Sequence, residues 1–339
     1  MKIDVMLLNN DLSTMAEYVQ AAETLGFDGL WTAETNHDPF FPLVVATEHS
    51  HQIQLGTAIA VTFPRAPGTL AQIGWDLAKY SKGRFILGLG SQVRAHNERR
   101  FGATWDKPVR QMRESIEAIR AIWHSYQTGE RLQYEGEYFK LSLMTPFFNA
   151  GPIEYPNVPI YISAVNKLML RLAGSHCNGV HLHAINTVRY LAEYAWPQIE
   201  AGMQKGGRSR SEFQAAAGVF VIPTDAQESA KIEAYVRQQI SFYLSTPAYR
   251  IVTELHGWEE VGFRLSKMAR RGEWQEMPTL ISDEMMSEFV VSEKWSKLPG
   301  KLREKYGTLL DRVSYYLPYT LGEEDEGWRE TVLGMKGLF

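Results

Sequence analysis

Three side chains that can hold or transfer protons follow one short apolar segment near the N-terminus. Glu34, His37 and Asp38 come just after residues 29–32, whose sequence GLWT is typical of a buried strand. The pKa of a histidine lies near neutrality, so His37 can orient a ligand or exchange a proton with it beside the Glu34 carboxylate. A proline follows Asp38, and this pair is typical of a helix N-terminus, here a helix over 40–49. We therefore expect His37 and Glu34 to act on a ligand and Asp38 to cap a helix. A solvated loop is the alternative for His37.

A glycine-rich bend with polar residues after it forms the second candidate site. The apolar segment 84–89 predicts a strand, and it leads into Gly90, Ser91, Gln92 and Arg94. A buried strand that ends in glycine and is followed by polar groups commonly builds a ligand site in α/β proteins. The dinucleotide pattern G-x-G-x-x-G fails, because a valine stands where the third glycine would be, and the Walker pattern is absent. Taken alone, the bend is an incomplete phosphate loop.

Two other strand ends carry residues that suit a ligand. Ala58 and Ile59 belong to a segment of small uncharged residues, which would let a flat ligand approach the backbone. A packed barrel strand would have the same composition.

A predicted strand over 159–163 runs directly into a predicted helix over 167–176. The free N–H groups and the dipole of a helix N-terminus suit a phosphate. The residues at the join are Ser163, Ala164, Val165 and Asn166. The alternative is that Ser163 or Asn166 only caps the helix.

Two histidines lie two residues apart on the predicted strand 179–183. His181 and His183 therefore point to the same face and could bind a metal ion. A third ligand is not evident, and the pattern His-Glu-x-x-His is absent. We therefore predict no metal site and expect His183 to form part of a polar wall near the strand end, where it would contact the cofactor.

The composition narrows the class of protein. The chain has 339 residues, 45% of them apolar, and a net charge of −4 without a run of basic residues, which argues against nucleic acid as the main partner. Its single cysteine, Cys177, allows no intrachain disulfide and no cysteine-rich zinc site. No apolar run approaches the roughly 20 residues of a membrane span, and the N-terminus lacks a signal-peptide pattern. We expect a cytoplasmic protein that does not bind membranes.

Short apolar strands alternate with amphipathic helices along most of the chain. The expected strands are 3–8, 29–32, 54–61, 84–89, 159–163, 179–183, 215–222 and 312–317. This alternation implies a parallel sheet, and eight units favour a closed (β/α)8 TIM barrel, with its active site at the C-terminal strand ends. We interpret 132–158, with a hairpin, and 247–305, which looks all helical, as insertions into one domain spanning 1–339. A polar tail is expected after the last strand.

Several motifs resemble those of a known family. The residues that carry this resemblance are Leu25-Gly26-Phe27-Asp28-Gly29-Leu30-Trp31, Leu55-Gly56-Thr57, Ser81-Lys82-Gly83-Arg84-Phe85, Pro159-Ile160-Tyr161-Ile162 and Arg171-Leu172-Ala173-Gly174. Together they resemble the bacterial luciferase-like monooxygenase superfamily over nearly the whole chain. The segments 87–93 and 37–40 resemble its coenzyme F420-dependent branch.

The resemblance implies a (β/α)8 barrel with a deazaflavin cofactor at its C-terminal mouth. It places a non-proline cis peptide at Ala58–Ile59 behind the ring, a cofactor loop at Gly90–Arg94 and a phosphate site at Ser163–Asn166. It matches His37 to the histidine that several F420 enzymes carry after the second strand.

Two departures from the family's patterns limit the function that the resemblance implies. Gln92 and Val93 stand near the position where sugar-phosphate dehydrogenases of the superfamily carry an acid. Thr35 stands where luciferase has a histidine, so light emission is not supported.

We therefore expect an F420-dependent oxidoreductase that transfers a hydride between the deazaflavin and a small organic substrate. An FMN-dependent luciferase-like monooxygenase is the alternative of the same class. A metal-dependent barrel hydrolase built on His181 and His183, and a cofactor-binding or light-sensing protein without turnover, are alternatives of other classes. A homodimer is also expected, with 247–305 as a lid or as the dimer surface.

Overall fold

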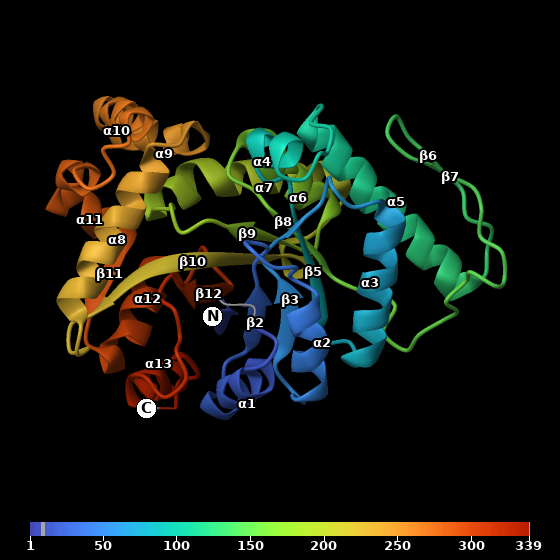
Figure 1. Ribbon diagram of the computed structural model, residues 1–339, viewed down its shortest axis with the longest axis horizontal. Helices are drawn as coiled ribbons and strands as arrows, with labels where there is room; N and C mark the ends of the chain where they lie inside the picture. Colours follow the sequence, from blue (N-terminus) through green and yellow to red (C-terminus); the bar gives the residue numbers. More distant parts are fainter. Residues whose placement is uncertain (8–10, 339) are drawn as a thin grey trace.

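Eight parallel strands close into a barrel in the computed structural model, which describes residues 1–7 and 11–338 (Figure 1). These strands are β1 (Lys2–Leu7), β2 (Gly29–Thr32), β3 (Gln54–Thr57), β5 (Phe85–Gly90), β8 (Ile160–Ser163), β9 (Gly179–Leu182), β10 (Gln214–Pro223) and β12 (Arg312–Tyr315). Each pairs with the next in that order, and β12 pairs with β1 to complete the ring. The predicted (β/α)8 barrel is confirmed. The end of the first predicted strand, Leu8, lies outside the described residues.

Helices surround this barrel and shield the apolar strands from water. They are α1 (Met15–Leu25), α2 (Phe41–Glu48), α3 (Pro67–Tyr80), α5 (Pro108–Thr128), α6 (Lys167–His176), α7 (Trp196–Gly206), α8 (Ser229–Leu244), α12 (Leu298–Tyr306) and α13 (Asp325–Met335). In α1, Met15, Val19 and Ala22 are buried at helical spacing. The helix ends at Gly26, whose φ of 94° is readily adopted by glycine and lets its N–H reach the last carbonyls of the helix.

Inward-facing side chains fill the barrel in layers because alternate residues of a strand face the same side. At the N-terminal end, Arg312 Nη2 lies 2.7 Å from Asp4 Oδ1, and the Trp31 indole donates to Asp4 Oδ2 at 2.8 Å. Trp31 and Tyr161 then fill the middle layer. The layer toward the C-terminal end contains smaller residues, among them Gly90. The barrel is thus closed at its N-terminal end by a buried ion pair.

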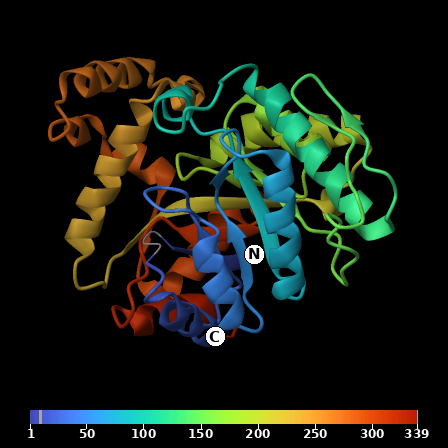
Figure 2. The ribbon, with the colours of Figure 1, turned by 45° about the vertical axis from the view of Figure 1, so that its right-hand side comes forward.

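Two insertions interrupt the alternation. The first contains the predicted hairpin, β6 (Tyr134–Glu135) paired antiparallel with β7 (Lys140–Leu141), which projects outside α5 (Figures 1 and 2). The second contains the helical segments η3 (Pro247–Tyr249), α9 (Arg250–His256), α10 (Glu259–Arg271), η4 (Met277–Leu280), α11 (Asp283–Phe289) and η5 (Trp295–Lys297). In both views α9 and α10 lie at the end of the barrel where α4 (Arg94–Arg99) follows β5, which is the C-terminal end. The assignment of 1–339 to one domain stays a prediction.

Two expectations about the C-terminal third are wrong. Residues 247–305 are not all helical, because β11 (Val290–Glu293) extends the sheet by pairing with the end of β10 from Phe220 to Pro223. The region after β12 is not merely a polar tail, because α13 buries Trp328 against Phe27. The apolar side chains of α13 recur at helical spacing, so the sequence pattern is sufficient to predict this helix.

Smaller differences concern element boundaries. The predicted strand 54–61 is divided into β3 and β4 (Ala60–Val61), and the peptide bond between Ala58 and Ile59 is cis, where the resemblance placed it. A π-helix, η1 (Tyr190–Ala195), runs directly into α7. A short 3₁₀ turn, η2 (Arg210–Glu212), precedes β10. None of the helices within residues 1–7 and 11–338 is long and apolar enough to cross a membrane.

Candidate functional site

The Glu34 carboxylate ties the loop after β2 to the segment after β3. Its Oε2 accepts hydrogen bonds from the Val61 N–H and from Arg65 Nη1, each at 2.7 Å, and only 4% of the side chain is exposed. Arg65 Nη2 also binds Asp38 at 2.8 Å. Burial alone would lower the pKa of Arg65, but its bonds to Glu34 and Asp38 raise that pKa overall. Glu34 therefore positions the residues after β3, in addition to the ligand role predicted for it.

Asp38 does not cap α2 as expected. The helix begins at Phe41, one residue later than predicted, and Phe40 occupies the N-cap position. Asp38 Oδ1 accepts the Phe40 N–H at 2.8 Å, and its other oxygen binds Arg65. The cap was predicted from the Asp-Pro pair alone. The sequence around Asp38 does not show that Arg65, from the loop after β4, binds this carboxylate.

His37 is exposed on the loop after β2. The carbonyl of Thr35 in the same loop accepts a hydrogen bond from Arg100, which follows α4. The loops after β2 and β5 therefore touch across the mouth of the barrel, and His37 lies near this contact. Its acid/base role stays a prediction.

A small shelf lies where β3, β5 and β8 end. We call Ile59, Gly90 and Ser163 the shelf. A Cβ on Gly90 would lie 2.5 Å from Ile59 Cδ1 and 2.8 Å from Ser163 Oγ, so the three residues converge closely. Ala58 and Ile59 are only partly buried. The shelf brings together residues from three of the predicted sites.

The bend after β5 is held by an asparagine that the sequence analysis did not single out. The buried Asn97 side chain donates to the carbonyl of Ser91 at 2.8 Å and to that of Val93 at 3.1 Å. Gln92 has a φ of 56°, which places its backbone in the left-handed region. Arg94 is largely exposed and pairs with Glu98 at 2.8 Å on the surface of α4. Ser91 and Gln92 thus lie beside the shelf, while Arg94 lies on the helix outside it.

The predicted phosphate segment 163–166 is tied to neighbouring elements by the protein's own groups. The Lys167 N–H donates to the Tyr194 hydroxyl at 3.1 Å, and the Asn166 amide donates to the carbonyl of Ala248 at 3.2 Å. The Tyr190 hydroxyl donates to the carbonyl of Val165 at 2.7 Å. A phosphate bound at this helix N-terminus would therefore lie against η1 and η3, and it would compete with Tyr194 for the Lys167 N–H.

The two histidines of the predicted pair lie in different layers of the barrel. The His181 ring packs against Trp31 at 4.9 Å and Tyr161 at 5.3 Å, whereas His183 lies closer to the mouth. No three His, Cys, Asp or Glu side chains among residues 1–7 and 11–338 are placed to hold a metal ion. Burial and the charge of Arg312 lower the pKa of His181 to about 3, and burial lowers that of His183 to about 4.

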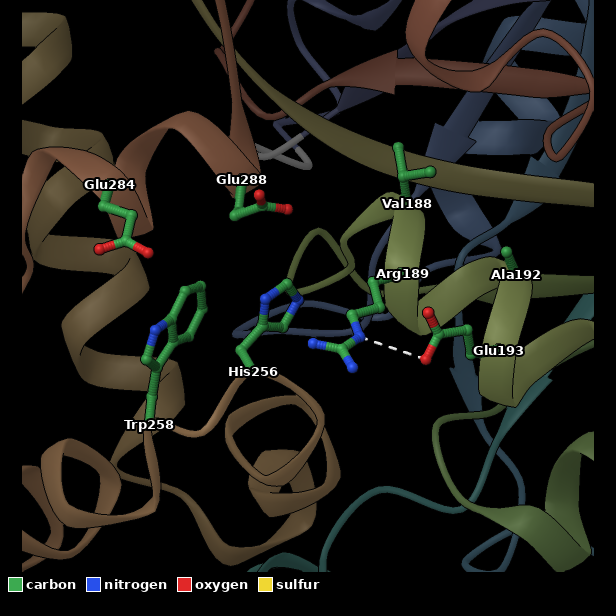
Figure 3. A pocket seen from close by; sticks show the side chains of 8 residues that line it. All are labelled: Val188, Arg189, Ala192, Glu193, His256, Trp258, Glu284 and Glu288. Carbon is green, nitrogen blue, oxygen red and sulfur yellow. Dashed lines mark hydrogen bonds and ion pairs between the residues drawn. The ribbon is translucent and has the colours of Figure 1, made fainter.

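An acidic cavity of about 510 Å³ lies between η1 and the second insertion (Figure 3). Its lining consists of Val188, Arg189, Ala192, Glu193, His256, Trp258, Glu284 and Glu288. The only basic side chain of this lining is Arg189, and Glu193 binds it at 3.1 Å. The carboxylates of this lining would repel a negatively charged ligand. This cavity is therefore unsuited to a phosphate or another anionic group of a cofactor. The shelf is therefore the better candidate for a cofactor.

The low pKa of His183 makes the stability of the protein depend on pH. Unfolding returns this pKa to about 6.5, so the unfolded chain takes up a proton that the folded chain does not bind. The contribution of His183 to the free energy of unfolding is complete above pH 6.5, and about 2–3 kcal/mol of it is lost as the pH falls to 4. Urea unfolding at several pH values should therefore show a smaller loss for His183→Gln than for the parent. Equal losses would contradict this expectation.

Comparison with known proteins places this fold in a family. The family described as luciferase-like monooxygenase matches residues 2–312. An uncharacterized protein of Mycobacterium tuberculosis is 44% identical over 305 residues, 90% of each chain. The 5,10-methylenetetrahydromethanopterin reductase of Methanolobus tindarius is 31% identical over 306 residues, 88% of this chain and 86% of the other. The coenzyme F420-dependent tetrahydromethanopterin reductase of Methanopyrus kandleri has a similar fold, with a TM-score of 0.78 at 24% identity over 98% of this chain and 97% of the other. The chain therefore belongs to the luciferase-like monooxygenase family.

Proposed function

We propose that the protein is an F420-dependent oxidoreductase that acts on a small organic substrate. The observation that carries this proposal is the shelf of Ile59, Gly90 and Ser163 at the barrel mouth. Gly90 and Ser163 are small, and a Cβ at position 90 would lie only 2.5 Å from the Ile59 side chain, so the three residues form a closely packed surface on which a flat ring could lie. The relatives that act on methylenetetrahydromethanopterin, and the fold shared with an F420-dependent reductase, support the choice of cofactor. When bound, coenzyme F420 supplies hydride transfer at C5 of its deazaflavin ring.

The chain's own residues would bind and orient this ring. Ile59 and Gly90 would back one face, Ser163 would lie at its edge, and Glu34 would hold the supporting segment through the Val61 N–H. The other face would be open to the substrate. The small-molecule substrate, the homodimer and the cytoplasmic location are parts of the proposal that rest on the sequence.

Titration with the two cofactors tests the proposal. We expect saturable binding of F420, followed by its fluorescence, and binding of FMN at least about tenfold weaker, a difference of about 1.4 kcal/mol. Tighter binding of FMN would favour the monooxygenases, which also occur among the solved structures with this fold. If the parent protein binds no F420, the proposal fails.

A pair of glycine variants locates the ring. Gly90→Ala should weaken F420 binding by about tenfold or more, because the new Cβ would push the Ile59 side chain from its position. Gly68→Ala is the matched control, because a Cβ at Gly68 in the first turn of α3 would meet nothing within 4 Å. Equal binding by both variants would place the cofactor elsewhere.

A further inference from the structure

Three tyrosines gather around His183 at the mouth of the barrel. The centroid of the His183 ring lies 4.2 Å from that of Tyr243, 5.0 Å from Tyr249 and 6.0 Å from Tyr316. We call these four residues the aromatic wall. They come from the loop after β9, from α8, from η3 and from the end of β12. All four side chains are only partly buried, so the wall borders accessible space.

The wall lies partly beside the shelf and partly across the barrel from it. His183 follows β9, which pairs with β8 and so lies next to Ser163, whereas Tyr316 follows β12, which stands opposite β5 in the ring of eight strands. The Tyr316 N–H donates to the Val219 carbonyl of β10 at 2.8 Å. The floor beside Tyr316 is glycine, since a Cβ on Gly218 would lie 3.6 Å from the tyrosine ring. A flat ring on the shelf would therefore have His183 at its side and Tyr316 across the barrel.

The wall offers hydrogen-bond donors and no charge. His183 Nδ1 accepts the Ile185 N–H at 3.1 Å, so in the neutral ring the proton is on Nε2. The hydroxyls of Tyr243 and Tyr316 are 2.7 Å apart, so one of them donates a hydrogen bond to the other. The hydroxyl that accepts this bond can still donate its own proton to a third group.

The surroundings of these rings keep them neutral. Within residues 1–7 and 11–338, no hydrogen bond or ion pair joins a charged side chain to the side chains of the wall. Burial raises the pKa of Tyr249 and of Tyr316 and lowers that of His183. His183, Tyr249 and Tyr316 therefore stay uncharged near neutral pH.

We propose that the aromatic wall binds the substrate and selects a flat, uncharged carbonyl compound whose oxygen accepts a hydrogen bond from His183 Nε2 or from the tyrosine hydroxyls. This inference rests on the proposed function, because the substrate would lie between the wall and the cofactor ring on the shelf. Flat compounds match the ring faces, and a neutral oxygen acceptor satisfies the donors. An anionic substrate would find no cation on the wall to offset the loss of its hydration.

A matched pair of probes tests the predicted substrate class. Acetophenone and benzoate have similar size and shape, but only benzoate is charged. Their binding to the full-length protein is measured by saturation-transfer NMR, first without cofactor and then with F420. We expect acetophenone to bind at least about tenfold more tightly than benzoate. Benzoate binding as tight as that of acetophenone, or no binding of acetophenone in either condition, would overturn the inference.

Three variants assign the contact to His183. His183→Phe keeps a flat ring but removes the donor, and it should weaken acetophenone binding about three- to tenfold. His183→Gln retains an N–H donor and should recover most of that affinity. Tyr80→Phe, at the exposed end of α3, is the control and should bind like the parent. Unchanged affinity in His183→Phe would overturn the role of His183.

Two further measurements keep these results interpretable. Tyr316→Phe breaks the hydroxyl pair without removing a ring, so it tests the wall if His183→Phe does not fold, and it should also weaken acetophenone binding. F420 affinity, measured separately, should change by less than about twofold in each variant. Failure of F420 to bind the parent would refute the proposed function, whereas loss of probe selectivity with F420 still bound refutes only the inference about the substrate.

Discussion

Replacing Arg312 with methionine is expected to lower the free energy of unfolding by about 3–5 kcal/mol. Arg312 and Asp4 lie at the closed end of the barrel with side chains 0% and 1% exposed, and two hydrogen bonds of 2.7 and 2.8 Å join them. Arg312→Met leaves the Asp4 carboxylate buried and without its cation, with Trp31 Nε1 as its remaining donor in this group. Urea unfolding followed by circular dichroism measures the loss.

Two further variants separate the buried charge from the loss of side-chain packing. Asp4→Leu combined with Arg312→Met removes both charges, and this double variant should be more stable than Arg312→Met alone. Lys301→Met removes an exposed ion pair of similar length, with Glu304 at 2.8 Å, and should unfold like the parent. A double variant less stable than Arg312→Met would show that the buried charge is not the main cause.

Replacing Glu34 with alanine should affect both stability and cofactor binding. The variant removes the acceptor of the Val61 N–H and leaves Arg65 with Asp38 as its remaining carboxylate partner. Breaking a buried ion pair from one side costs about 3–5 kcal/mol. Because the segment that Glu34 holds includes Ile59 of the shelf, F420 affinity should also fall by about tenfold or more. Fluorescence titration and urea unfolding measure the two effects.

An exposed carboxylate on the same side of the barrel is the control for Glu34. Glu98→Ala removes the partner of Arg94 on α4, where both side chains are largely exposed, so stability and F420 affinity should stay unchanged. Glu34→Gln keeps an oxygen acceptor and should lie between the parent and Glu34→Ala. If Glu34→Ala loses turnover but neither stability nor F420 affinity, then Glu34 acts on the substrate and does not position the shelf.

The spacing of apolar residues along the chain was sufficient to predict most strands and helices of the barrel. The bounds of β2 and α6 agree with the prediction, because short apolar runs and helical spacing are properties of neighbouring residues. β11 was not predicted, because its four residues lie inside a helical region and form a strand only by pairing with the end of β10. The helix α13 was missed although its apolar spacing was visible.

The partners of the predicted site residues were much harder to predict. Glu34 and Arg65 are 31 positions apart in the sequence, and only the closing of the barrel brings them together. Tyr243 and Tyr316 are 73 positions apart, and their contact depends on α8 packing against β10, which pairs with β12. Of the residues of the wall, only the position of Tyr316 could have been predicted from its neighbours in the sequence. It lies two residues after Ser314 and four after Arg312, so it faces the same side of the strand as they do.

The alternation of strands and helices, the family resemblance and the strand ends at which a site would form all follow from the order of the amino acids. Which side chains meet at those strand ends follows from the folding of the barrel. It assigned the Glu34 carboxylate to Val61 and Arg65, and it surrounded His183 with tyrosines from three later elements. The physical reason is that periodicity reports which face of an element is buried, whereas hydrogen bonds and ring contacts depend on ångström-scale distances between residues far apart in the chain.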